Sequence, residues 1–471
     1  MRAWKPGRLI LAVVMALTAV PLAASAASKQ IDPSVVRAQP MGTCFDGLTV
    51  ASDCSPVIPF ADDWVLAGAA QDAQIAAAGG ISTNASCSGY YVTMTIVSRY
   101  SLAKFNTTFN PPSDGVILRA SSIAVPSGFS ALDMTSTTYD AYSYIAHLYA
   151  TNDPQVAGIA APLYVLTAAP VPRAGPGTMP VPASPGEAWA PSERIAGTAT
   201  VVVFDTSVDP RKMDLAPRDG FLDATAGHAT FIEGILEAVY EGPVELVDIT
   251  DSRGIITEAS MAVALATYPF VKGDVASLSA GTYACQVGDR TIHPLLLADA
   301  VERLDAQAVP LAAAAGNDAT TMPFYPAAWG VHPTPKYVRQ CPPGTLYREA
   351  VTRLCMIDRA DVVTSVGSIA SSTPLVSYTV PSAAQRSAFS NHGNWVEAWA
   401  VGENLVSTYP GGAYSYCVPA GPGMCAAPGG GTVGVPAQDA PAAHIGAHAR
   451  WDGTSFATPM VAAWIAGGKV P

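Results

Sequence analysis

Residues 198–204 read TATVVVF, and Asp205 follows them directly. The run is short, continuous and rich in β-branched residues, which is typical of a strand buried on both faces of a parallel sheet. Similar runs recur at residues 244–249, 274–279, 309–315, 362–369 and 395–401. We therefore expect a sheet whose strands come from the whole second half of the chain.

Stretches with helical spacing separate several of these runs, at residues 229–240, 258–266 and 295–306. Strands that alternate with helices predict an α/β fold, with a parallel sheet covered by helices on both sides. In such sheets the functional side chains gather beyond the carboxyl ends of the strands. Asp205, at the exit of the first buried run, is therefore a candidate.

The composition excludes several classes of protein. The chain has 471 residues, enough for two or three domains, and 49% of them are hydrophobic while only 13% are charged. A disordered chain and a coiled coil do not fit these values. The formal net charge of −12 favours solubility and argues against nucleic acid as a partner.

The N-terminus predicts a secretory signal peptide over residues 1–26. Arg2, Lys5 and Arg8 precede an apolar run at 9–23, and the small residues 24–26 then form a cleavage site before Ala27. A membrane anchor is the alternative, but the run is about 15 residues long and spanning takes about 20. We expect a secreted, extracellular protein that has no membrane contact once the signal is removed.

The eight cysteines fit an oxidising compartment. Metal binding is the alternative, but no CxxC or HxxxH spacing supports it. Disulfides are therefore expected, most simply as three local pairs and one long-range pair: Cys44–Cys54, Cys341–Cys355, Cys417–Cys425 and Cys87–Cys285.

Three regions follow the signal segment. Residues 27–169 are rich in Ala, Ser and Thr and carry no catalytic pattern, and residues 170–194 form a Pro/Gly-rich linker. The third region, 195–471, holds all the strand and helix signals described above. It is also where polar residues of catalytic types are found.

Four polar residues occur at strand or helix boundaries of this third region. Asp205 ends a strand, His228 opens a helical stretch within GHAT, and Asn317 follows the small-residue run AAAAG. Alone, Asp205 is most simply a helix or turn cap, His228 a structural histidine and Asn317 a turn residue. Ser455 lies in GTSFATP (453–459), at the start of another helical stretch whose first turn would include Pro459.

Together these residues meet the needs of acyl transfer. A serine attacks a carbonyl only if a base takes its proton, the histidine base needs an acid to fix its tautomer, and the oxyanion needs donors. A helix N-terminus with its unpaired N–H groups also suits a developing oxyanion. The order Asp, His, Asn, Ser supplies every role.

Over roughly 195–471 the chain resembles the subtilisin-like (subtilase, S8) family of serine endopeptidases. VFDTSVD (203–209), GHATFIEG (227–234), AAGN (314–317) and GTSFATP (453–459) are similar to the family's aspartate, histidine, oxyanion and serine motifs. Residues 277–281 and FSNHG (389–393) give weaker matches. The resemblance implies a three-layer subtilisin-like α/β fold with a mostly parallel central sheet, preceded by an N-terminal pro-region or accessory domain at 27–169.

The resemblance also implies residue roles. Ser455 would be the nucleophile, His228 the general base, Asp205 the residue that orients it, and Asn317 an oxyanion donor together with the Ser455 N–H. Asp209 is a rival to Asp205, but Asp205 lies closer to the strand end and aligns with the motif. Two wall segments would bind a polypeptide substrate as added strands: Ser277, Leu278, Ser279, Ala280 and Gly281, and Ala315 with Gly316 at the end of 314–316.

No cofactor is expected, and no metal ligand is assigned. Subtilases often carry structural calcium, but no acidic loop here is distinctive enough to name ligands for it. The expected partners are polypeptide substrates and the chain's own N-terminal pro-region, which would block the cleft until it is removed.

Several departures from the family pattern motivate an alternative, a degenerate subtilase that acts as a binding protein. Ser207 and Ala229 stand where glycine is usual, and Glu233 adds a charge near the histidine turn. Sixteen residues follow Ser455, which predicts a short and weakly anchored helix. An esterase is disfavoured, because its GxSxG serine would precede the acid and the histidine.

Overall fold

The computed structural model describes most of the second half of the chain. The described ranges are 180–191, 193–207, 226–250, 256–287, 290–332, 360–370, 374–415 and 442–469, with short strands at 60–68, 94–95, 118–119, 129–133, 160–166, 222–223, 334–337, 347–348, 354–357, 419–421, 424–426 and 432–433. The signal segment 1–26, Asp209, and the side chains of the eight cysteines lie outside this description. The predicted disulfides therefore stay predictions.

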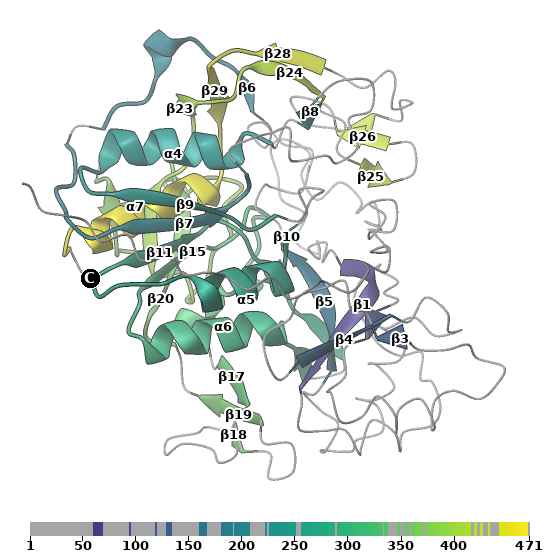
Figure 1. Ribbon diagram of the computed structural model, residues 1–471. Helices are drawn as coiled ribbons and strands as arrows, with labels where there is room; N and C mark the ends of the chain where they lie inside the picture. The colour runs from purple at the N-terminus through teal and green to yellow at the C-terminus, as the bar shows by residue number, and fades with distance from the viewer. Residues whose placement is uncertain are drawn as a thin grey trace, which may run out of the picture. The chain divides into compact units, whose positions relative to one another are not determined.

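A seven-stranded sheet forms the centre of the fold, in the order β21-β22-β20-β15-β11-β7-β9 (Figure 1). All neighbouring pairs are parallel except β21–β22. The strands are β7 (Val201–Asp205), β9 (Val244–Asp248), β11 (Val275–Leu278), β15 (Leu311–Ala314), β20 (Val363–Ile369), β21 (Val376–Ser377) and β22 (Ala398–Val401). The predicted α/β fold with its mostly parallel sheet is confirmed.

The middle strands of this sheet are buried along their whole length. All five residues of β7 are buried, as are all four residues of β11 and of β15. This is why the sequence shows continuous apolar runs rather than alternation. The small side chains of β15, which reads LAAA, leave room for a helix to pack closely on the sheet.

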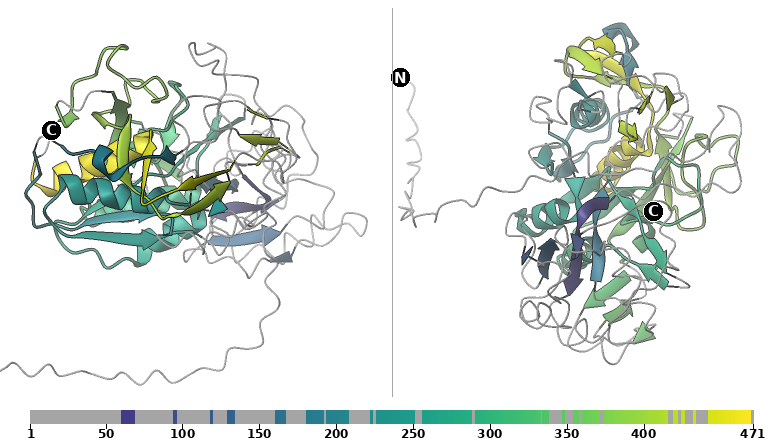
Figure 2. Two further views of the ribbon diagram at one scale, coloured as in Figure 1. Left: turned by 90° about the horizontal axis from the view of Figure 1, so that it is seen from above. Right: turned by 90° about the vertical axis from the view of Figure 1, so that its right-hand side faces the viewer.

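Within the described ranges, four helices cover the sheet: α4 (His228–Val239), α5 (Glu258–Thr267), α6 (Leu295–Ala306) and α7 (Thr454–Ala466). Helices α4 and α7 lie side by side on one face, and α5 and α6 pair on the other (Figures 1 and 2). One apolar cluster joins α4, α7 and the sheet, through residues such as Phe231, Ile235, Val203, Phe456 and Met460. None of the described helices has both the length and the apolar character needed to cross a bilayer.

Helix α5 is tied to α6 by a buried carboxylate. Glu258 has no exposed surface, and its Oε2 accepts hydrogen bonds from the backbone N–H groups of Leu296 (3.2 Å) and Leu297 (3.5 Å). These N–H groups lie in the first turn of α6, where no carbonyl of the helix can bind them. A negative charge at a helix N-terminus is also favourable.

Helix α7 differs from its prediction in two ways. Pro459 is its sixth residue, so it lies inside the helix and not in the first turn. The helix is also firmly anchored, since residues 454–463 are all buried against the sheet and α4. The short sequence after Ser455 therefore does not weaken the packing of this helix.

Strand pairings join described parts of the N-terminal regions to the α/β core. Residues of the predicted linker form β6 (Val181–Pro182), which pairs antiparallel with β29 (His448–Trp451). Strand β5 (Ala160–Leu166) pairs antiparallel with β10 (Ile256–Thr257). The last part of the predicted linker is thus hydrogen-bonded to the core.

Candidate active site

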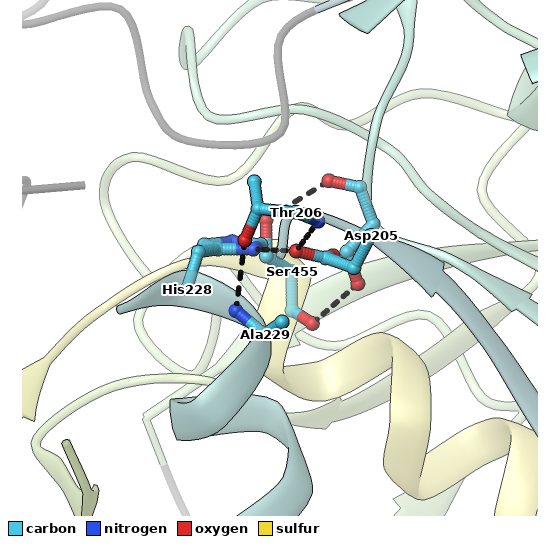
Figure 3. Close-up of polar contacts among 6 residues, drawn as sticks. Asp205, Thr206, His228, Ala229 and Ser455 are labelled. Atoms are coloured by element: carbon cyan, nitrogen blue, oxygen red, sulfur yellow. Dashed lines mark hydrogen bonds and ion pairs between the residues drawn. The ribbon is translucent and has the colours of Figure 1, made fainter. Parts of the chain in front are cut away.

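Asp205 and His228 form the centre of the site (Figure 3). Asp205 is the last residue of β7, and His228 is the first residue of α4. Their side chains meet at 2.7 Å, between His228 Nδ1 and Asp205 Oδ1, and both are almost fully buried. Because an ionised carboxylate can only accept, Nδ1 carries the proton and Nε2 presents a lone pair.

The backbone around this pair fixes its geometry. The N–H of Thr206 donates to Asp205 Oδ1 (2.7 Å), the same oxygen that His228 Nδ1 contacts, while Oδ2 is buried and has no hydrogen-bond partner among the described residues. The Thr206 hydroxyl accepts from the N–H of Ala229 (3.1 Å), which joins the end of β7 to the first turn of α4. These contacts place the histidine at the carboxyl edge of the sheet, where function was expected.

Aromatic side chains enclose the imidazole. The Trp451 ring meets the His228 ring edge-on at 5.4 Å, and the Phe456 ring lies tilted at the same centroid distance. Among the described residues, His228 Nε2 is buried and has no hydrogen-bond partner. The imidazole therefore presents Nε2 in a setting lined by aromatic rings.

Ser455 is the second residue of α7 and is 2% exposed. Its hydroxyl donates to the carbonyl oxygen of Ser279 (3.3 Å), and its own carbonyl accepts from the Ser279 hydroxyl (2.7 Å). The residue four positions on is Pro459, which has no N–H to give to the Ser455 carbonyl. Ser279 thus supplies the hydrogen bond that the helix lacks.

Asn317 is held against the start of α7. Its Oδ1 accepts from the backbone N–H of Thr454 (2.8 Å) and from the Thr454 hydroxyl (2.9 Å). Because a backbone N–H can only donate, the amide oxygen must face Thr454 and the amide nitrogen must face away. This orientation leaves Nδ2 available as a donor beside the N-terminus of the helix that carries Ser455.

The wall segments differ in what they can offer a substrate. Ser277 and Leu278 lie within β11, paired to β7 on one side and to β15 on the other. The Ala315 N–H and carbonyl bind Val366 and Asn391, and those of Gly316 bind Thr454 and Asn391. Residues 279–281 follow the end of β11 and are buried. The backbone groups of residues 315–316 are already paired, so pairing with an added peptide strand would require them to exchange partners.

An aromatic ring lies between these two segments. A Cβ built on Gly281 or on Gly316 would meet the Phe324 ring, at 3.3 Å in the case of Gly316. Gly316 has a φ of +98°, which disfavours any side chain there. Phe324 was not singled out from the sequence, because a lone aromatic residue after a turn gives no signal of a cleft.

The departures from the family pattern leave the backbone unstrained. Neither Ser207 nor Ala229 is among the described residues with positive φ, and both side chains are buried. Glu233 is half-buried, and burial, with Glu237 nearby, raises the pKa of its carboxyl group. The missing glycines therefore do not disturb the pairing of Asp205 with His228.

Sequence reasoning missed the residues that hold the site together. Thr454, Trp451, Tyr283 and Asn391 each contact a site residue or its turn, although Thr454 and Asn391 lie inside the quoted motifs. Within the described ranges, no group of three or more His, Cys, Asp or Glu side chains is placed to hold a metal ion.

Comparison with solved structures gives matches of low similarity. The patellamide maturation protease PatA is 21% identical, over 58% of this chain and 79% of that chain, with a TM-score of 0.32. A cold-adapted subtilisin-like serine proteinase is 18% identical (59% and 77% covered, TM-score 0.32), and a lanthipeptide protease 16% (57% and 73%, TM-score 0.33). No curated protein matches the chain.

A comparison with protein-family models identifies the family of the chain. The model of the subtilase family of peptidases matches residues 225–467, more than half of the chain. This span contains His228, Asn317 and Ser455 but begins after Asp205, whose place in the site rests on its contact with His228. The chain belongs to the subtilase family of serine-type peptidases.

Proposed function

We propose that the protein is a secreted serine endopeptidase that hydrolyses peptide bonds through an acyl-enzyme intermediate. The observation that carries this proposal is the buried imidazole of His228. Its Nδ1 is fixed by Asp205 at 2.7 Å, while its Nε2 is unpaired among the described residues and lies beside the first turn of α7. This is the arrangement that a general base for a nearby serine requires.

The first chemical step transfers one proton and forms one bond. The Ser455 hydroxyl turns from the Ser279 carbonyl to His228 Nε2, as hydrogen bonds in free enzymes often tighten only on substrate binding. Oγ then attacks the substrate carbonyl as its proton passes to Nε2. The imidazolium is stabilised by the Asp205 carboxylate, which keeps its own charge.

The tetrahedral oxyanion needs donors that are in place before it forms. Asn317 Nδ2, whose direction is set by Thr454, would be one donor, and the Ser455 N–H would be the other. His228 then returns the proton to the leaving amine, which breaks the peptide bond and leaves the acyl group on Ser455. Water repeats the sequence with the same base and releases the acid.

Polypeptide substrates, secretion and activation complete the proposal. The sequence features at 1–26 support export, and the cysteine count supports disulfides in an oxidising compartment. Residues 27–169 would be a pro-region or accessory domain that is removed or displaced on activation. N-terminal sequencing of secreted protein tests this, because a mature start at Ala27 would contradict removal.

A fluorophosphonate probe tests the activity without knowledge of the preferred substrate. Wild type should be labelled at Ser455, whereas Ser455→Ala should not be labelled and His228→Ala should react far more slowly. Circular dichroism of all three proteins controls for folding. A well-folded wild type without Ser455-dependent labelling would refute an active protease.

The degenerate binding protein is the second candidate. It is favoured by one observation, the hydrogen bond from the Ser455 hydroxyl to Ser279 rather than to His228. The unstrained backbone at Ser207 and Ala229 argues against it. The same labelling experiment separates the two candidates, since a binding protein would retain its fold and fail to react.

A further inference from the structure

The turn that carries Asn317 is built around another asparagine side chain. Asn391 has no exposed surface. Its Oδ1 accepts from the N–H groups of Asp318 (2.9 Å) and Thr320 (3.2 Å), and its Nδ2 donates to the carbonyl of Ala315 (2.7 Å). The side chain therefore binds the backbone on both sides of Asn317.

Backbone contacts close the same turn from outside. The Asn391 N–H donates to the Gly316 carbonyl (2.9 Å), and the Ala319 N–H donates to the Phe389 carbonyl (2.8 Å). Asn317 is thus flanked on both sides by backbone groups that bind the segment 389–391: the Gly316 carbonyl before it and the N–H groups of Asp318 and Ala319 after it. Its side chain can place Nδ2 accurately only if this turn does not shift.

A buried tyrosine completes the network. The second hydrogen of Asn391 Nδ2 goes to the Tyr283 hydroxyl (2.6 Å), and that hydroxyl donates to Asp318 Oδ2 (2.5 Å). Tyr283 is 2% exposed, and its ring packs edge-on against Phe324 at 4.9 Å. With these bonds the Asn391 amide uses two donors and two acceptor sites, which is its full capacity.

We propose that Tyr283 and Asn391 are positioning residues that set the Asn317 amide for the oxyanion. They contact neither substrate nor reacting atoms, so they act through Asn317 alone. This inference rests on the proposed function, because it assigns a role in that reaction. A buried, fully satisfied polar network of this kind rigidifies what it binds.

The variant Tyr283→Phe removes only the hydroxyl. The measured quantity is the fluorophosphonate reaction at Ser455, split into a maximal rate and a half-saturating concentration, because the phosphonyl oxygen occupies the oxyanion position. We expect a roughly ten-fold lower maximal rate with an unchanged half-saturating concentration. Asn317→Ala should lose about 10²–10³ in rate.

The decisive experiment uses the double variant that carries both Tyr283→Phe and Asn317→Ala. If Tyr283 acts through Asn317, Tyr283→Phe should change the rate by less than about two-fold in the Asn317→Ala background. Tyr240→Phe is the control, since Tyr240 is also 2% exposed and its hydroxyl also makes a hydrogen bond, to the Ala199 carbonyl (2.6 Å), whereas the Tyr283 hydroxyl makes two. It should lose thermal stability and keep the wild-type labelling rate.

Two further variants keep the proposal testable if Tyr283→Phe fails to fold. Asp318 is only half-buried, so Asp318→Ala removes the acceptor of the tyrosine hydroxyl without opening the core, and it should slow labelling in the same way. Asp318→Asn keeps an acceptor oxygen and should restore most of the rate. These variants test the hydrogen bond between Tyr283 and Asp318 while they leave the packing of the Tyr283 ring unchanged.

The outcomes separate this inference from the proposed function. Wild type that is folded and shows no Ser455-dependent labelling overturns the proposed function, and this inference with it. Wild type that reacts, together with Tyr283→Phe and Asp318→Ala at wild-type rates, overturns the inference alone. The inference is also overturned if Tyr283→Phe lowers the labelling rate by the same factor in the wild-type and in the Asn317→Ala background.

Discussion

Ser279 and Ser455 exchange two hydrogen bonds, each through the hydroxyl of one and the carbonyl of the other, at 2.7 and 3.3 Å. The shorter bond fills a gap in α7, because Pro459 cannot donate to the Ser455 carbonyl. The longer bond holds the hydroxyl of the proposed nucleophile away from its base. The strand end after β11 and the helix start of α7 are therefore coupled through these two residues.

This coupling predicts the effect of Ser279→Ala on stability. The substitution removes the hydroxyl that donates to the buried Ser455 carbonyl, and loss of this hydrogen bond costs about 1–3 kcal/mol in the free energy of unfolding. The measurement is chemical denaturation of purified protein. In a Pro459→Ala background the new N–H of residue 459 can bind the same carbonyl, so the cost of Ser279→Ala should fall to below about 1 kcal/mol. Equal costs in both backgrounds would contradict this prediction, because they would mean that the N–H of residue 459 does not replace the Ser279 hydroxyl.

A second prediction concerns the contact between α4 and β23 (Leu405–Thr408). A Cβ on Gly234 would collide with the hydroxyl oxygens of Ser407 and Thr408. These hydroxyls donate to carbonyls of α4, at Phe231 (2.8 Å) and Thr230 (3.0 Å), so they cannot move without breaking hydrogen bonds. Gly234→Ala should therefore destabilise the fold by about 1–3 kcal/mol.

The control for that variant is Gly186→Ala. A Cβ at Gly186 meets nothing within 4 Å, so this substitution should leave the free energy of unfolding within about 1 kcal/mol of wild type. Both variants are compared by urea denaturation. If Gly234→Ala were as stable as Gly186→Ala, the close approach of α4 to β23 would be incorrect.

A third prediction tests which aspartate orients the histidine. Asp205→Asn replaces the acceptor at 2.7 Å from His228 Nδ1 by an amide that can bind the wrong tautomer. The rate of Ser455 labelling should fall by up to about 10⁴ while the fold is kept. Asp209→Asn makes the same replacement of a carboxylate by an amide at the rival aspartate, and this variant should react at the wild-type rate. A larger loss in Asp209→Asn would reverse the assignment.

The fold could be predicted from the sequence because its signals are local. The run VVVF before Asp205 gave the first strand to within a few residues, and the predicted stretches at 229–240 and 295–306 correspond to α4 and α6. The apolar runs of buried strands and the spacing of apolar residues in helices involve residues that are close together in the sequence. These patterns can therefore be recognised from the sequence alone. The short antiparallel strand β21 carried no such signal.

The site could be predicted only in part, because the residues that hold its side chains in place come from distant segments of the chain. Asn317 could be placed by its motif, but the orientation of its amide depends on Thr454, 137 residues later. Tyr283 and Asn391 are 108 residues apart and meet only in the folded protein. Pro459 was expected in the first turn, because a proline inside a helix leaves one carbonyl without its N–H donor. The sequence does not show that the Ser279 hydroxyl replaces this donor.

The last prediction concerns Asp452, three residues before Ser455. Burial raises the pKa of its carboxyl group to about 6, and Glu403 adds to the rise, while the hydrogen bond from the Asn404 N–H (2.6 Å) and the charge of Arg450 oppose it. A pKa above that of the unfolded chain means that the fold favours the protonated acid. The stabilisation is complete below about pH 4 and is lost as the pH rises through about 6.

Asp452→Asn should remove this dependence and keep the hydrogen bond, because its amide oxygen can still accept from the Asn404 N–H. Relative to wild type, the variant should gain free energy of unfolding as the pH is raised from 4 to 7. Asp452→Ala should show the same flat profile at a lower level, since it loses the acceptor as well as the charge. Denaturation curves at several pH values check both variants. A wild-type stability that rises between pH 4 and 7 by more than that of Asp452→Asn would show that the ionised carboxylate is the form the fold prefers.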